Sequence, residues 1–208
     1  MAKRGFMTKS HLPMAKRFRN LLPIVIDLET SGLNPLTDAI LEIAAVTLVA
    51  DEAGKLKPDQ THAYQVEPFI GARLDPEALE LTKIDPTYPL RFAIPERQAL
   101  HRLFRITKEL LAETQCQRAV LVGHNAWFDL SFLQAAAKRS LLEDNPFHSF
   151  TTFDTATLSG VFFGETVLAR AARAARIPFD VNQAHSAIYD AERTAELFCY
   201  IVNKMKTS

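Results

Sequence analysis

Four carboxylates and one histidine stand in three short segments that are widely separated along this chain of 208 residues. The segment IVIDLETSG holds Asp27 and Glu29, GHNAWFD holds Asp129, and HSAIYD holds His185 and Asp190. Carboxylates that lie close together in apolar surroundings repel one another unless a cation sits between them. A fold that uses all five must bring the three segments together, and this requirement constrains the architecture more strongly than composition does.

The bulk composition is that of one globular domain. Hydrophobic residues make up 48% of the chain and charged residues 23%, and this length can bury a core without disulfides. No apolar run approaches the roughly 20 residues of a membrane span, and no signal peptide opens the chain. Cys116 and Cys199 are far apart in the sequence, which indicates buried thiols in a reducing compartment. We therefore expect a cytoplasmic protein that does not contact a membrane.

Charge is spread unevenly, although the net charge is zero. Six basic residues precede the first acid, and the rest holds 18 basic against 24 acidic residues, a net of −6. The six are Lys3, Arg4, Lys9, Lys16, Arg17 and Arg19. This pattern suits a body whose carboxylates bind a metal, with a basic arm that can reach phosphates. We expect residues 1–16 to be a disordered N-terminal extension and residues 17–208 to form a single domain.

Apolar runs and helical spacing predict the order of the elements. Strands are expected at residues 23–28, 40–49, 62–67 and 119–122. Helices are expected at residues 76–81, 96–114, 129–139, 165–176 and 186–205, with loops over most of 68–95 and over 145–154. Three strands in a meander, followed by strands alternating with helices, predict an α/β fold with a mixed sheet flanked by helices on both faces.

Each acidic segment has a plain structural alternative. Asp27 and Glu29 are two apart on a strand and so share a face, but an exposed strand end would also explain them. Asp129 lies near a helix start, where it could be only an N-cap. The polar step before it, GHN, follows a strand at the edge where α/β sheets place ligand sites. His185 alone would more often be structural, so the signal lies in the combination.

The combined set predicts a two-metal site for phosphodiester cleavage. Mg²⁺ or Mn²⁺ prefers hard oxygen ligands in octahedral geometry, so four carboxylates suit two such ions and suit zinc poorly. Two ions roughly 3.5–4 Å apart would stabilise both the attacking and the leaving oxygen of an in-line displacement. A neutral imidazole, with an unperturbed pKa of about 6.5, can deprotonate the attacking water.

The three motifs resemble those of the DEDD exonuclease superfamily, whose ribonuclease-H-like domain carries Asp-x-Glu, Asp and Asp. The third motif is H-x4-D in one branch and Y-x3-D in the other. His185 lies five residues before Asp190, as in H-x4-D. The residue four before Asp190, where the other branch has tyrosine, is Ser186. The chain therefore resembles the histidine branch. The resemblance implies a Mg²⁺ site formed by Asp27, Glu29, Asp129, His185 and Asp190, with His185 as general base.

Within that branch, residues 17–204 are similar to homodimeric exoribonucleases. These enzymes trim the 3′ ends of transfer RNA and other structured RNAs, often also single-stranded DNA, and release 5′-mononucleotides. The resemblance is carried by the segments VEPFIGARL, PEAL, AHSAIYDAERTA, NPFH and TFDTATLSG. It implies a metal-dependent 3′→5′ exoribonuclease that acts as a homodimer on RNA 3′ ends.

The resemblance also implies how the RNA 3′ end is held. The family stacks four phenylalanines against the terminal bases, and Phe128 and Phe150 match two of them. The other two positions are leucines in this chain. The substrate-binding residues implied near the site are Leu33, Glu77, Leu81, Asn125, Phe128 and Phe150.

A basic patch of one subunit is implied to feed RNA to the active site of the other. Arg17, Arg19 and Arg118 match that patch, whereas Ala112 and the pair Glu143–Asp144 stand where relatives are basic. Elsewhere, arginines recur every three residues at 170, 173 and 176, which favours a solvated helix face over a phosphate track. Asp154 is expected to have a structural role in a turn, because four carboxylates already satisfy the site.

Two other functions fit part of the pattern. A DNA-directed proofreading or repair exonuclease would need the same chemistry, and no residue here can be assigned to reading the 2′-OH that distinguishes RNA. A non-catalytic nucleic-acid-binding module is the alternative from another class. Such a module has no reason to keep four mutually repelling carboxylates, so we favour the enzyme.

Overall fold

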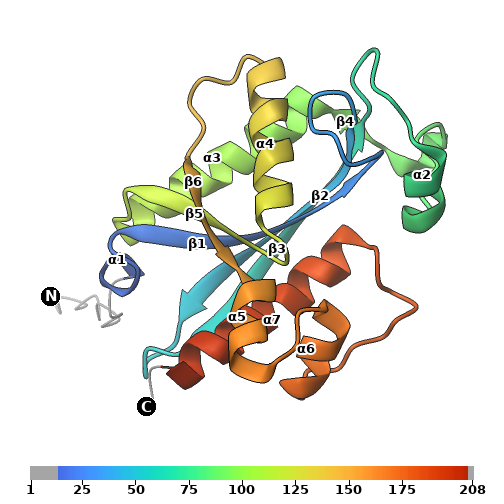
Figure 1. Ribbon diagram of the computed structural model, residues 1–208. Helices are drawn as coiled ribbons and strands as arrows, with labels where there is room; N and C mark the ends of the chain where they lie inside the picture. Colours follow the sequence, from blue (N-terminus) through green and yellow to red (C-terminus); the bar gives the residue numbers. More distant parts are fainter. Residues whose placement is uncertain (1–13, 206–208) are drawn as a thin grey trace, which may run out of the picture.

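The computed structural model describes residues 14–205 (Figure 1). The tail predicted for residues 1–13 lies outside the described residues. Helix α1 (Met14–Arg17) includes the last three residues of the predicted extension, and Met14 and Ala15 are buried in the core. The folded body therefore extends at least to Met14.

A six-stranded mixed sheet in the order β4-β3-β2-β1-β5-β6 forms the centre of the molecule. β1 lies in its interior, antiparallel to β2 and parallel to β5. The antiparallel β2–β3 pair extends the sheet on one side, and β6 runs parallel to β5 on the other. The strands are β1 (Leu21–Thr30), β2 (Ile40–Ala50), β3 (Leu56–Glu67), β4 (Ile94–Pro95), β5 (Arg118–Gly123) and β6 (Phe147–Asp154).

Helices cover both faces of the sheet (Figure 1). Helix α7 (Ala187–Met205) packs on one face against β1, β2 and β3, while α3 (Glu96–Thr114) and α4 (Trp127–Arg139) cover the other. The remaining helices are α2 (Pro76–Thr82), η1 (Pro89–Arg91), α5 (Thr155–Phe163) and α6 (Leu168–Ala174). The predicted mixed α/β architecture is confirmed. None of the helices within residues 14–205 is long and apolar enough to cross a membrane.

The prediction of a loop at residues 145–154 is wrong, because Phe147–Asp154 forms β6. β6 is an edge strand that pairs only with β5, and most of its side chains are partly or fully exposed, so it lacks the apolar pattern of a core strand. Helix α5 was not predicted either. The Asp154 side chain caps it by accepting from the Ala156 N–H, which is the structural role expected of Asp154.

Candidate active site

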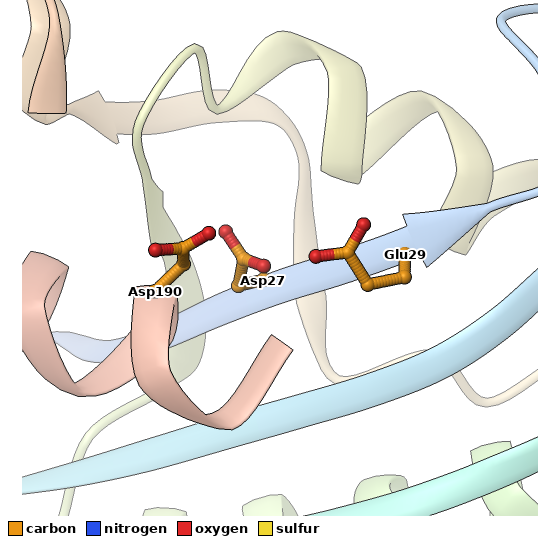
Figure 2. Close-up of side chains that lie close together, drawn as sticks. All are labelled: Asp27, Glu29 and Asp190. Atoms are coloured by element: carbon orange, nitrogen blue, oxygen red, sulfur yellow. The ribbon is translucent and has the colours of Figure 1, made fainter. Parts of the chain in front are cut away.

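Three carboxylates converge above β1 (Figure 2). Asp27 and Glu29 are two residues apart on β1, and Asp190 projects from the first turn of α7. One oxygen of each lies within 4.8 Å of the others. Figure 2 shows the three carboxyl groups pointing toward one another. Asp27 and Glu29 therefore share a face of β1, as strand periodicity predicted, and the fold brings Asp190 of the third motif to them.

Asp129 adjoins this cluster from α4. Its side chain is buried, and its Oδ1 accepts a hydrogen bond from the backbone N–H of Leu28 at 3.1 Å. Gly123 permits the approach, because a Cβ there would lie 3.2 Å from Asp129 Oδ2 and 3.1 Å from Ala126 Cα. The N-cap of α4 is Ala126, so the alternative of Asp129 as a mere N-cap is wrong.

Burial and mutual repulsion make the ionised cluster unfavourable without a counterion. Burial raises the pKa of Asp27 well above its usual range, and the charges of Asp129 and Glu29 raise it further. Burial, with the charge of Asp190 next, raises the pKa of Glu29 to about 8. Burial also raises the pKa of Asp129 to about 8, although the hydrogen bond from Leu28 acts in the opposite direction.

The donor set fits divalent cations. Asp190 Oδ2 accepts from the backbone N–H of His185 at 2.9 Å, whereas its buried Oδ1 has no hydrogen-bond partner among the described residues. A buried carboxylate oxygen without a donor is costly unless a metal ion binds it. Hard oxygen donors of this kind are what Mg²⁺, Mn²⁺ and Ca²⁺ prefer.

His185 lies at the rim of the site. Its side chain is exposed and its backbone is left-handed, with a φ of 64°. The group of ligand atoms within 4.8 Å contains neither its ring nor Asp129, among the residues the structure describes. The fold thus brings the His185 backbone to Asp190 and leaves the His185 side chain exposed.

The residues expected to hold the RNA 3′ end differ in how exposed their side chains are. Leu33 and Phe150 are 83% and 80% exposed, and Leu81 and Glu77 are exposed on α2. Phe128 is instead partly buried, with its ring 4.9 Å from that of Phe132. Asn125 is exposed in a left-handed turn, and its N–H donates to Asp154.

The arginines expected in the basic patch also differ. Arg17 donates to the Gly54 carbonyl and to Asn203 Oδ1, so its side chain joins the β2–β3 turn to the end of α7. Arg19 and Arg118 are exposed. The backbones at Arg19 and Arg118 lie near each other. The Gln117 N–H donates to the Asn20 carbonyl at 2.8 Å, and Arg118 is the partner of Leu21 in the β1–β5 register.

This arginine end of β1 is remote from the carboxylates. Asp27 is six positions after Leu21 on β1, which is about 20 Å at 3.3 Å per residue. The three arginines that recur every three residues are also exposed at the surface. They lie on α6 and just after it, at Arg170, Arg173 and Arg176.

Sequence reasoning missed two residues beside the site. Glu42 lies opposite Glu29 in the β1–β2 register, and its carboxylate accepts from the Ala187 N–H at the start of α7. A single carboxylate inside the apolar run ILEIAAVTLVA was the available signal. Trp127 opens α4 next to Phe128 and is 69% exposed. It is the chain's only tryptophan.

Comparison with known structures and families agrees with this fold. Residues 24–198 match the model of an exonuclease family, RNase_T. Exonuclease I of E. coli in complex with a dT13 oligonucleotide superposes with a TM-score of 0.69 at 16% identity, covering 90% of this chain and 42% of that one. A 3′-exonuclease solved with a histone mRNA stem-loop gives 0.69 at 19% identity, over 88% and 63%. This chain thus spans less than half the length of exonuclease I, and the likeness shows the shared fold.

Fold and site together define a metal-dependent 3′→5′ exonuclease. Proteins named ribonuclease T from Marinobacter nauticus and Cronobacter sakazakii are 55% and 56% identical, over 93% of this chain and 88% and 86% of theirs. The ribonuclease T of Salmonella typhimurium is 55% identical, over 93% and 90%. The chain therefore belongs to the RNase_T exonuclease family, as an exoribonuclease similar to ribonuclease T.

Proposed function

We propose that this exoribonuclease trims the 3′ ends of transfer RNA and other structured RNAs, releasing 5′-mononucleotides with two Mg²⁺ ions per site. Mn²⁺ can substitute, and single-stranded DNA is a secondary substrate. The observation that carries the proposal is the convergence of ligand oxygens of Asp27, Glu29 and Asp190 within 4.8 Å. Asp129 adjoins them through its hydrogen bond from the backbone of Leu28 on β1. The names of the 55–56% identical relatives support RNA as the substrate.

The chain's own residues divide the chemistry between holding metal and moving a proton. Asp27, Glu29, Asp129 and Asp190 would hold the cations, which when bound activate a water and stabilise the leaving oxygen. His185, exposed beside Asp190, would accept the proton of that water at a ring nitrogen. The bond from its N–H to Asp190 ties the position of the base to that of a metal ligand.

Exposed apolar side chains would hold the terminal nucleotides. Phe150 and the partly exposed Phe128 offer rings on which a base can stack, and Leu33 and Leu81 offer apolar contact without a π face. Glu77 and Asn125 would add hydrogen bonds to the sugar or the base.

A homodimer would account for the remote arginines. Arg19 and Arg118 are too far from Asp27 to touch the nucleotide being cleaved, so they would bind RNA upstream or serve the partner subunit's site. Arg17 would contribute mainly by fixing this end of the subunit. We expect the enzyme to act in the cytoplasm, where the buried free thiols of Cys116 and Cys199 stay reduced.

The decisive test compares matched RNA and DNA single strands, labelled at the 3′ end, in Mg²⁺ and in EDTA, with Asp27→Asn as the inactive control. We expect labelled mononucleotides from RNA in Mg²⁺ alone, and faster release from a transfer RNA with extra 3′ nucleotides than from a blunt duplex. Faster cleavage of DNA than RNA would favour the proofreading or repair alternative. Binding without cleavage would favour the non-catalytic module.

A further inference from the structure

A chain of hydrogen bonds runs through the sheet to the start of α7. Arg91 Nε donates to Gln65 Oε1 at 3.1 Å, and Gln65 Nε2 donates to Glu42 Oε1 at 2.6 Å. The other carboxylate oxygen of Glu42, Oε2, accepts from the Ala187 N–H at 3.3 Å. The four residues come from η1, β3, β2 and α7. Arg91, Gln65 and Glu42 lie outside the three acidic motifs, whereas Ala187 lies within the third.

The Arg91 end of this series of hydrogen bonds is anchored on β2. Arg91 Nη2 donates to the Leu41 carbonyl at 2.8 Å, and the guanidinium is partly buried. Because Leu41 precedes Glu42 on β2, Arg91 is hydrogen-bonded to the same strand that carries the Glu42 carboxylate. Gln65 pairs with Glu42 in the β2–β3 register, which keeps their side chains on one face.

The Glu42 end of this series of hydrogen bonds contacts Ala187, which lies in the third motif. Ala187 is the first residue of α7, so its N–H has no acceptor within the helix and Glu42 supplies one. A carboxylate at a helix N-terminus also interacts favourably with the helix dipole. Ala187 follows His185 by two residues and precedes Asp190 by three, and a contact that fixes it therefore fixes both.

The position of Glu42 carries an electrostatic cost. It faces Glu29 across the strand pair, and its charge contributes to the raised pKa values of Asp27 and Glu29. Glutamine would avoid that repulsion but has only one acceptor oxygen, whereas both oxygens of Glu42 accept from N–H donors. We propose that Glu42 is a positioning residue, held by Gln65 and Arg91, which places Asp190 and His185 for metal binding and catalysis. This inference rests on the proposed metal role of Asp190.

An exchange of the two side chains tests the proposal. In Glu42→Gln one of the two N–H donors loses its acceptor, and in Gln65→Glu two carboxylates face each other. In the double variant, the amide introduced at position 42 can accept from Ala187 and donate to the carboxylate introduced at position 65. That carboxylate can in turn accept from Arg91, so every bond is restored without a carboxylate at position 42. We expect each single variant to weaken Mg²⁺ binding about tenfold or more, as for other groups that orient metal ligands, and the double variant to recover most of the loss.

The readouts separate positioning from general stability. Mg²⁺ is titrated into the RNA-free full chain by calorimetry, and kcat is measured at saturating Mg²⁺ alongside the melting temperature. Glu67→Gln, an exposed carboxylate on the same sheet, is the matched control and should match the parent in all three. Parent-like Mg²⁺ affinity and kcat in Glu42→Gln would overturn the proposal.

A double variant as defective as the singles would also overturn it, because the charge at position 42 rather than the bonded geometry would then matter. If either single variant does not fold, the double variant alone decides, since it is expected to fold and to bind Mg²⁺ within a few-fold of the parent. Asp190→Asn tests the underlying site separately. Undiminished Mg²⁺ binding in Asp190→Asn would remove the metal assignment itself, whatever the exchange shows.

Discussion

The backbone N–H of Leu28 donates a hydrogen bond to Asp129 Oδ1 at 3.1 Å, which joins the second acidic segment to the strand that carries the first. Leu28 lies between Asp27 and Glu29, so this bond sets Asp129 beside both. The bond uses Oδ1, so Asp129 would offer Oδ2 to a cation. The arrangement explains how residues about a hundred positions apart reach one site.

Neutralising a single carboxylate should stop catalysis without damaging the fold. Asp27→Asn and Asp129→Asn keep the shape of each side chain, and the amide oxygen introduced at position 129 can still accept from Leu28. Turnover should fall at least about 100-fold, and His185→Ala should lose a similar factor through its missing proton acceptor. RNA affinity, measured in Ca²⁺, should stay near that of the parent, because it comes mainly from phosphate and base contacts. Near-normal turnover in any of the three purified variants would remove that residue from the site.

The metal-free protein should become less stable as the pH rises. Glu29 and Asp129 have pKa values of about 8 in the fold, against roughly 4 in an unfolded chain. Between these values the folded state binds more protons, so the free energy of unfolding falls with rising pH. The melting temperature in EDTA should therefore drop from about pH 5 to pH 8, and Glu29→Gln should flatten this dependence.

Saturating Mg²⁺ should oppose the same trend, because metal binding displaces protons and strengthens as the carboxyls ionise. Glu67→Gln serves as a control that should keep the parent's slope. A melting temperature in EDTA that is constant or rises over this range would contradict the burial of the cluster.

The strongly amphipathic and apolar segments were predictable from the sequence. Helix α3 has the predicted bounds, and the strand with Asp27 and Glu29 has the predicted face. What escaped prediction depends on partners distant in sequence. β6 is defined by pairing with β5, Glu42 by an N–H donor 145 residues away, and Arg17 by an acceptor on Asn203, 186 residues away. Local patterns carry no information about such contacts.

Separate arginine variants should distinguish RNA binding from stability. Arg19→Ala/Arg118→Ala should weaken RNA binding and lower the slope of log affinity against log salt by roughly 0.7 for each phosphate that is no longer bound. Dinucleotide cleavage should be nearly unchanged, because these side chains are remote from the carboxylates. Arg17→Ala should instead lower the melting temperature, since it removes the bonds to Gly54 and Asn203. An unchanged salt slope in the double variant would exclude these two arginines from the RNA path.

Mixing the arginine double variant with a metal-site variant tests whether the patch serves the partner's site. Arg19→Ala/Arg118→Ala lacks the patch, and Asp27→Asn lacks the metal site. In a dimer with one subunit of each kind, a cross-subunit arrangement leaves one intact patch facing one intact site, so activity on structured RNA should rise above that of either variant alone. Light scattering should show a dimer at the concentrations assayed. A monomer that is fully active would exclude the arrangement.

The leucines at positions 33 and 81 should make the grip on the RNA 3′ end weaker and less base-selective than four phenylalanines would. Stacking on an aromatic ring contributes roughly 1–3 kcal/mol per base, and leucine keeps the apolar contact but has no π face. Phe150→Ala should therefore cost more affinity than Leu33→Ala, and it is a cleaner probe than Phe128→Ala, because the Phe128 ring also packs on Phe132. Leu33→Phe/Leu81→Phe should tighten binding and sharpen discrimination among terminal bases. The measurement is the affinity, in Ca²⁺ to suppress cleavage, for four RNA oligomers that differ only in the last nucleotide. If the double phenylalanine variant binds all four no better than the parent, these positions do not stack on the RNA.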